Sequence, residues 1–243
     1  MEFKGERATL YDNLEWAREP KFIDYVIGMG RFQKGDRVLD VGTGTGIMAD
    51  AICPLVSEVV GLDISHDMLS LNHVNGNFDA VEGDIRKSGL PSESFDKVVA
   101  RQVFHHILTG AGGAIDECYR LLRPGGLMVL AEGVPPSKEI KRHYKAVFAL
   151  KEERVTFMEE DLENLLRKGL FADVQSISIW QRQMSIRNWL ANSGLPQDKQ
   201  DAIFALYPQF ETLCKRAYNM RQTKDGDYLI DMKQVIVVGK KRR

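Results

Sequence analysis

The stretch VLDVGTGTGI, residues 38–47, decides the fold. A short apolar run contains one acid, Asp40, and leads into three glycines spaced by two: Gly42, Gly44 and Gly46. Glycines after a strand allow strained backbone angles and let a ligand approach without meeting a Cβ atom. The spacing departs from the Gly-x-Gly-x-x-Gly of dinucleotide-binding proteins, because residue 47 is Ile. A buried carboxylate is costly unless it is paired, so Asp40 favours a ligand with a positive group, such as an ammonium.

Short apolar runs alternate with helical patterns around this stretch. The runs are typical of strands buried on both faces, and they lie at residues 37–41, 58–63, 78–84, 95–100 and 126–132. Helices are predicted between them at residues 46–53, 66–74 and 113–122. Repeated strand–helix–strand units predict an α/β fold, with a doubly wound, mostly parallel sheet and helices on both faces.

The flanking sequence predicts helical additions to this core. We expect one or two helices in residues 9–30, an amphipathic helix at 137–151 and a helical region at about 186–220. A capping box at Thr156–Glu159 is expected to begin a further helix that ends at Gly169. Strands at 174–180 and 234–240 complete the pattern.

No internal repeat or linker divides the chain, so residues 1–243 are predicted to form a single domain. Its first two parts are an N-terminal helical lid (1–34) and a cofactor-binding core (35–132). They are followed by lid and substrate-binding helices with strand six (133–233), and by the last strand with a basic tail (234–243). The segments expected to close over the site are 1–25, 133–157 and 181–222.

Composition narrows the possible partners. The formal net charge of -1 provides no field that attracts nucleic acid or an acidic membrane surface. Three scattered cysteines, Cys53, Cys118 and Cys214, argue against a disulfide framework or a metal site. The N-terminus lacks the apolar core of a signal peptide, and no apolar run approaches the roughly 20 residues of a membrane helix. We therefore expect a cytoplasmic protein without membrane insertion.

Two further acids follow the next strands. Asp63 ends the second predicted strand, where an acid accepts hydrogen bonds from ribose hydroxyls. Asp84 follows the third strand, where a carboxylate beside a backbone N–H suits the amino group and ring nitrogen of adenine. The three acids together favour an adenosine with a cationic amino-acid tail and no phosphates. The alternative is that Asp63 and Asp84 only cap the helices that follow them.

This set of motifs resembles the class I S-adenosylmethionine-dependent methyltransferases. The matching segments are LDVGTGTG (39–46), GLDIS (61–65), GDI (83–85), FDKVVARQVFHHI (95–107) and LLRPGGLMVL (121–130). The resemblance covers about residues 35–132, and it is greatest to the branch that methylates small metabolites, including quinone precursors. It implies a Rossmann-like, seven-stranded sheet with a final antiparallel strand.

The resemblance also implies a cofactor, S-adenosylmethionine, which leaves as S-adenosylhomocysteine. Gly42 and Gly44 let the methionine part pass over the loop, Asp40 reaches its ammonium group, and Asp63 holds the ribose. The remaining implied cofactor-binding residues are in the loop (Thr43, Gly46), beside the sugar and adenine (Ile64, Met68, Asp84, Ile85), beside the methionine (Arg101, Gln102) and on the covering segment (Tyr11).

Two histidines follow the fourth strand, at the edge where a methyl acceptor is expected. His105 and His106 are candidate general bases. The alternative is that one packs at a helix start while the other only lines the pocket, since adjacent side chains are not expected to point the same way. Aromatic residues that are candidates for the acceptor pocket are Tyr11, Trp16, Tyr144, Phe148, Trp180, Trp189 and Tyr218.

The function predicted from these features is methyl transfer to an oxygen, nitrogen or carbon atom of a small molecule by in-line displacement. In such a reaction the protein mainly aligns the reactants and excludes water. The alternative from another functional class is a noncatalytic module that only binds the cofactor. A nucleic-acid methyltransferase is disfavoured because Ala100–Val103 lacks an Asn/Asp-Pro-Pro-aromatic element. The glycine spacing disfavours a nicotinamide-dependent oxidoreductase.

Overall fold

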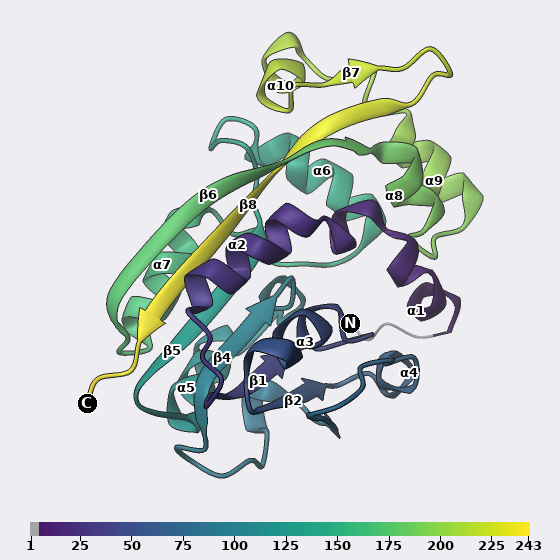
Figure 1. The fold of residues 1–243 in the computed structure, drawn as a ribbon. Coiled ribbons are helices and arrows are strands. Elements are labelled where there is room, and N and C mark those ends of the chain that lie inside the picture. Colours follow the sequence, from purple (N-terminus) through teal and green to yellow (C-terminus); the bar gives the residue numbers. More distant parts are fainter. Residues whose placement is uncertain (1–4) are drawn as a thin grey trace.

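The computed structural model describes residues 5–243, so residues 1–4 of the predicted lid lie outside the described part. Its centre is a sheet in the order β3-β2-β1-β4-β5-β8-β6, with the short β7 paired to β8 (Figure 1). The strands β1 to β5 are parallel, and β8 runs antiparallel between β5 and β6. Their bounds are β1 Arg37–Val41, β2 Glu58–Asp63, β3 Phe78–Glu82, β4 Phe95–Arg101, β5 Leu122–Gly133, β6 Ala172–Ser185, β7 Arg221–Gln222 and β8 Tyr228–Lys240.

Helices cover both faces of this sheet, and successive strand residues pack into different cores. Val38 of β1 packs with apolar residues of α2 (Pro20–Gly30) and α3 (Ile47–Ile52). Leu39, the next residue, packs with α5 (Ala111–Leu121) and α7 (Glu159–Lys168). The same alternation holds for Val98 and Val99 of β4. The predicted doubly wound fold, with its antiparallel last strand, is confirmed.

Several predicted boundaries were wrong. The strand predicted at 78–84 is not buried on both faces, because β3 is the edge strand and Asp79, Ala80 and Glu82 are exposed. Helix α4 (His66–Ser70) ends well before residue 74. The capping box lies two residues beyond the predicted one: Met158 precedes α7, and its N–H donates to Asp161 at 2.8 Å. Asp161 occupies the position from which a side chain can return to the helix start.

The region after β5 forms a lid with its own apolar core. Helix α6 (Lys141–Lys151) packs in it with α8 (Ile186–Ala191), α9 (Gln197–Phe204) and α10 (Thr212–Ala217). These helices gather at one end of the molecule, where β6 and β8 extend past the parallel strands (Figure 1). Strand β8 begins at Tyr228 rather than at residue 234, because Leu229 and Ile230 pair with β6.

The N-terminal segment connects the lid to the glycine loop. It contains α1 (Glu6–Leu10) and two 3₁₀ turns, Tyr11–Asn13 and Glu15–Arg18. The Thr45 hydroxyl donates to Asp12 at 2.6 Å, and the Gln181 amide donates to the Trp16 carbonyl at 2.8 Å. Within residues 5–243, no helix has both the length and the apolar character needed to cross a membrane.

Candidate functional site

A cavity of about 390 Å³ lies at the carboxyl ends of β1, β2, β4 and β5. The N-terminal segment, α6 and α8 contribute the rest of its lining. This is the edge of an open α/β sheet where ligands bind. The cavity is lined by every predicted site residue except Gly46: Tyr11, Asp40, Gly42, Thr43, Gly44, Asp63, Ile64, Met68, Asp84, Ile85, Arg101, Gln102, His105 and His106.

Asp40 and Arg101 place a carboxyl group and a guanidinium group on the wall of this cavity. Asp40 is 2% exposed and accepts a 2.8 Å hydrogen bond from the Thr43 hydroxyl. Burial raises the pKa of Asp40 to about 7, although Thr43 and the charge of Arg101 oppose the shift. The Arg101 guanidinium donates from Nη1 to the Ala17 carbonyl at 2.9 Å, while its buried Nε has no hydrogen-bond partner among the described residues. A carboxylate and a guanidinium on one cavity suit a ligand that carries both an ammonium and a carboxylate.

The glycine loop is closely packed beneath the cavity. Gly42 has a φ of +66°, and a Cβ atom there would lie 2.2 Å from Cγ2 of Val103. Gly46 has a φ of +95° and packs against Asn72 and Val74, so it shapes the loop without lining the cavity. Bare backbone at these two positions is therefore required by the fold itself.

Asp63 is held in place by the loops on either side of it. One carboxylate oxygen accepts from Gly44 N–H at 2.8 Å and the other accepts from Ser65 N–H at 2.9 Å. Burial raises the pKa of Asp63, and these two bonds oppose the shift. Each carboxylate oxygen keeps a second lone pair, so Asp63 remains able to accept from a diol.

Asp84 has a partner of its own. Its carboxylate accepts from Arg86 N–H at 2.8 Å and pairs with the Arg86 guanidinium, which lowers the pKa of Asp84. The capping alternative therefore describes part of what Asp84 does. Near it Ile85 and Met68 are buried, whereas Ile64 is 45% exposed.

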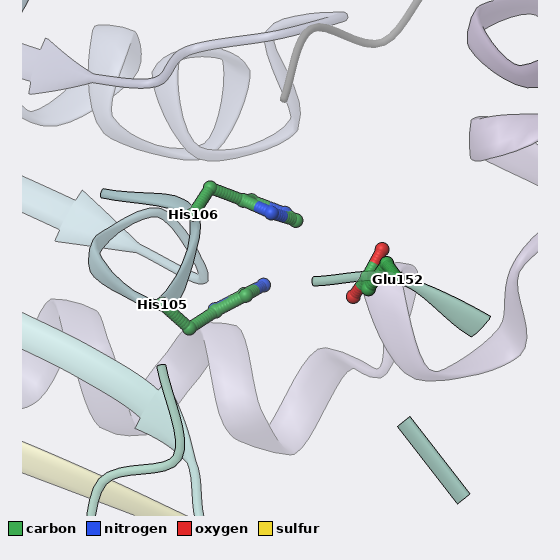
Figure 2. A group of neighbouring side chains, drawn as sticks. All are labelled: His105, His106 and Glu152. Carbon is green, nitrogen blue, oxygen red and sulfur yellow. The ribbon is translucent and has the colours of Figure 1, made fainter. Parts of the chain in front are cut away.

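His105 and His106 point into the same cavity, contrary to the expectation that they diverge. They lie in the 3₁₀ helix Phe104–His106, and their ring centroids are 3.9 Å apart. Figure 2 shows both imidazoles directed toward the Glu152 carboxylate. Burial lowers the pKa of each histidine well below its ordinary value, and the positive charge of Arg154 adds to this. Both rings are therefore neutral at pH 7 and able to accept a proton.

Glu132 orients His105, and the sequence analysis missed it. Its Oε2 lies 2.6 Å from His105 Nδ1, and its Oε1 accepts the backbone N–H groups of Val103 and Phe104. The side chain is fully buried, which raises the pKa of Glu132 to about 7. The sequence contained one signal that could have identified Glu132 as a site residue. Glu132 lies near the carboxyl end of a predicted strand, β5, just as Asp63 lies at the end of β2.

The lid contributes a second set of missed residues. Glu152 is surrounded by Arg7, Lys151 and Arg154, and all four line the cavity. Of the predicted pocket aromatics, Trp180 does not line the cavity and Tyr218 packs in the lid core, whereas the others contribute to the wall: Tyr11, Trp16, Tyr144, Phe148 and Trp189.

A mostly parallel α/β sheet with this glycine loop and with acids at the strand ends defines a Rossmann-like protein that binds an adenosine-bearing cofactor. Residues 39–130 match the family model described as a methyltransferase domain. Over this stretch the chain is similar to the class I S-adenosylmethionine-dependent methyltransferases, and the cofactor of such a domain is S-adenosylmethionine.

Two curated proteins are similar in sequence to part of this chain. A probable S-adenosylmethionine-dependent methyltransferase of Mycolicibacterium smegmatis is 36% identical over 100 residues, which cover 40% of this chain and 38% of that protein. A ubiquinone/menaquinone biosynthesis C-methyltransferase of Coxiella burnetii is 31% identical over 124 residues, 47% of this chain and 49% of that protein. The matched segments thus span less than half the length of these two relatives.

The fold similarity extends further along the chain. A putative methyltransferase of Bacillus halodurans superposes with a TM-score of 0.78 at 19% identity, over 92% of this chain and 100% of that one. This likeness covers about twice as much of the chain as either of the two sequence matches.

The residues present fit the cofactor. Asp40 and the unpartnered Nε of Arg101 complement the two charges of its amino-acid group, and Asp63 offers lone pairs to the ribose hydroxyls. Buried Met68 and Ile85 provide apolar surface for an adenine ring.

Proposed function

We propose that this chain transfers a methyl group from S-adenosylmethionine to a small-molecule acceptor bound beside His105 and His106. The observation that supports this most directly is that one cavity contains both the predicted cofactor-binding set and a second group of lining residues. That group consists of the two histidines and the aromatic side chains of α6 and α8.

Within this proposal the chain's own residues act mainly by binding and alignment. Asp40 and Arg101 would hold the amino-acid end of the cofactor, and Asp63 would hold the ribose. The bound cofactor supplies an activated methyl group. The N-terminal segment and the lid helices would exclude water from the part of the cavity beside the histidines and fix the acceptor in line with that methyl group.

His105 is the candidate base when the acceptor must lose a proton. With Glu132 ionised, the 2.6 Å contact places a proton on Nδ1 of His105 and leaves Nε2 as an acceptor. Glu132 is then a positioning residue, which fixes both the tautomer and the ring orientation. His106 is the second candidate for the same task.

The relatives support a small acceptor. A quinone precursor is the acceptor class named for the Coxiella relative, and an aromatic acceptor suits the aromatic wall of this cavity. A cytoplasmic location, inferred from three cysteines that are buried and unpaired, belongs to the same proposal.

The first test is thermal unfolding with S-adenosylmethionine, S-adenosylhomocysteine or NAD. A ligand at roughly a hundred times its dissociation constant adds about 2.7 kcal/mol to stability. We expect stabilisation by the first two ligands and not by NAD. Transfer of a labelled methyl group to a panel of small acceptors then tests catalysis, and a cofactor-bound protein that methylates nothing favours the noncatalytic alternative.

A further inference from the structure

One part of the cavity carries a surplus of buried positive charge. Arg7, Lys151 and Arg154, which we call the cation cluster, surround the single carboxylate of Glu152. Arg7 and Lys151 both contact Oε2, the latter at 2.9 Å, and Arg154 lies 3.6 Å from Oε1. The Lys151, Arg154 and Glu152 side chains are only 10%, 7% and 2% exposed. Buried charge is costly unless it is balanced.

The acidic side chains in this part of the cavity do not balance the excess positive charge. Burial alone would raise the pKa of Glu152, but the charges of Lys151 and Arg7 hold it well below its usual range, so Glu152 is already ionised. Burial lowers the pKa of Lys151 to about 8, which still leaves the amine mostly protonated at neutral pH. Glu132, the other acid here, is engaged with His105 and with backbone N–H groups. Among the described residues, the buried cations Lys151 and Arg154 therefore share the one carboxylate of Glu152, which Arg7 also contacts.

Arg154 retains a hydrogen-bond donor within this cluster. Its buried Nε has no hydrogen-bond partner within residues 5–243. Its guanidinium lies 4.2 Å from the ring centroid of Phe148 and 5.6 Å from that of Tyr144. The planar group is thus fixed against an aromatic wall, with a donor that the protein does not use.

Glu152 and the two histidines could also ligate a metal ion, but the positive charges around them oppose metal binding. His105, His106 and Glu152 have ligand atoms within 4.8 Å of one another (Figure 2). A divalent cation would use such ligands. Here, however, it would have to displace or approach Arg7, Lys151 and Arg154. The surplus positive charge favours an anion instead.

We propose that the methyl acceptor carries an anionic oxygen group, a carboxylate or a phosphate, that binds Arg7, Lys151 and Arg154. Its apolar or aromatic body packs against Tyr144, Phe148 and Trp189. This proposal rests on the proposed function and specifies the acceptor class of that site. A second cavity of about 50 Å³ shares these three aromatic residues and continues the apolar surface into the lid core.

The test uses the full chain saturated with S-adenosylhomocysteine. Thermal unfolding is followed against benzoate, phenyl phosphate and neutral benzamide, three probes with the same ring. We expect one or both anions to bind at least about tenfold more tightly than benzamide. The benzoate and phenyl phosphate arms then distinguish a carboxylate from a phosphate.

Matched variants locate the binding. Lys151→Met and Arg154→Met remove one charge each and keep an apolar side chain of similar length. Each is expected to weaken anion binding about tenfold without weakening S-adenosylhomocysteine binding. Arg142→Met, which removes an exposed cation on the same helix, is the control and should change neither. Lys151→Met alone suffices if Arg154→Met does not fold.

Three results overturn the proposal while the proposed function stands: equal binding of benzamide and the anions, no binding of either anion, or undiminished anion binding in both variants. Stabilisation by Zn²⁺ in place of the anions, lost in Glu152→Gln, also overturns it in favour of a cation site. If S-adenosylhomocysteine itself fails to stabilise the chain, the proposed function fails and this proposal fails with it.

Discussion

At the scale of single residues, the acids at the strand ends differ in their surroundings and therefore in their roles. In the proposed function Asp63 has the most direct part in cofactor binding. We expect Asp63→Ala to weaken S-adenosylmethionine binding about a hundredfold, because charge-assisted hydrogen bonds to the ribose are lost together with the support of Gly44. Isothermal titration measures the change. Asp79→Ala, an exposed acid on the edge strand, is the control, and an unchanged affinity for Asp63→Ala would refute the ribose assignment.

Asp40 makes both stability and cofactor binding depend on pH. Its folded-state pKa is raised from 3.8 to about 7, so the folded chain holds this proton more tightly than the unfolded chain does. Its contribution to stability is therefore present in acid and is lost as the pH rises through about 7. We expect the Tm of the ligand-free protein to fall between about pH 4 and 7, and to fall less in Asp40→Asn.

Cofactor affinity should change in the opposite direction over this range. The ionised form of Asp40 pairs with an ammonium group, so S-adenosylmethionine affinity is expected to rise as the pH passes about 7 and protons to be released on binding. Titrations in buffers of different ionisation enthalpy measure the protons. An Asp40→Asn protein with the same pH dependence as the wild type would contradict this role.

Glu132 should affect turnover more than binding. In Glu132→Gln the amide can still accept from the Val103 and Phe104 N–H groups, but its NH₂ donates to His105 Nδ1 and moves the imidazole proton to Nε2. We expect kcat to fall about a hundredfold with the acceptor KM nearly unchanged, as for loss of a general base. The two constants are measured with the identified acceptor. A rise in KM alone would mean that Glu132 only shapes the pocket.

At the scale of elements, the N-terminal segment depends on a few polar contacts. The Thr45 to Asp12 hydrogen bond joins it to the glycine loop. Thr45→Val is expected to cost about 1 kcal/mol of stability and to speed amide exchange in residues 5–18, since one buried partner is lost. Hydrogen exchange detects this. Ser94→Ala, which removes an exposed hydroxyl elsewhere, should leave exchange in that segment unchanged.

The sequence predicts some elements well and others poorly, for physical reasons. Strands β1, β2 and β4 are local apolar runs, because strands buried on both faces must be apolar whatever their neighbours. The start of β8 is different: Tyr228 to Asp231 become a strand through pairing with β6, which no local pattern reveals. Arg7 likewise meets Glu152 only through tertiary packing, whereas Asp40 and Asp63 belong to the predicted strands themselves.

At the scale of the whole molecule, the lid and the parallel core share two long strands. Tyr228 and Ile230 of β8 pack in the lid core, while Val235 and Val237 of the same strand pack in the sheet core. We therefore expect a single unfolding transition in calorimetry, with equal calorimetric and van't Hoff enthalpies. Two separated transitions would show that the lid unfolds on its own.

The position of β8 after both of its neighbours, β5 and β6, in chain order has a consequence for synthesis. Until residues 228–240 leave the ribosome, the edge of β5 has no partner and β6 has no neighbour, although nearly all of the cofactor-binding residues have already been made. An unpaired strand edge in a nascent chain invites association with other chains. The nascent protein therefore needs β8 before its sheet is complete, and a premature stop before residue 228 would yield an aggregation-prone product rather than a weak enzyme.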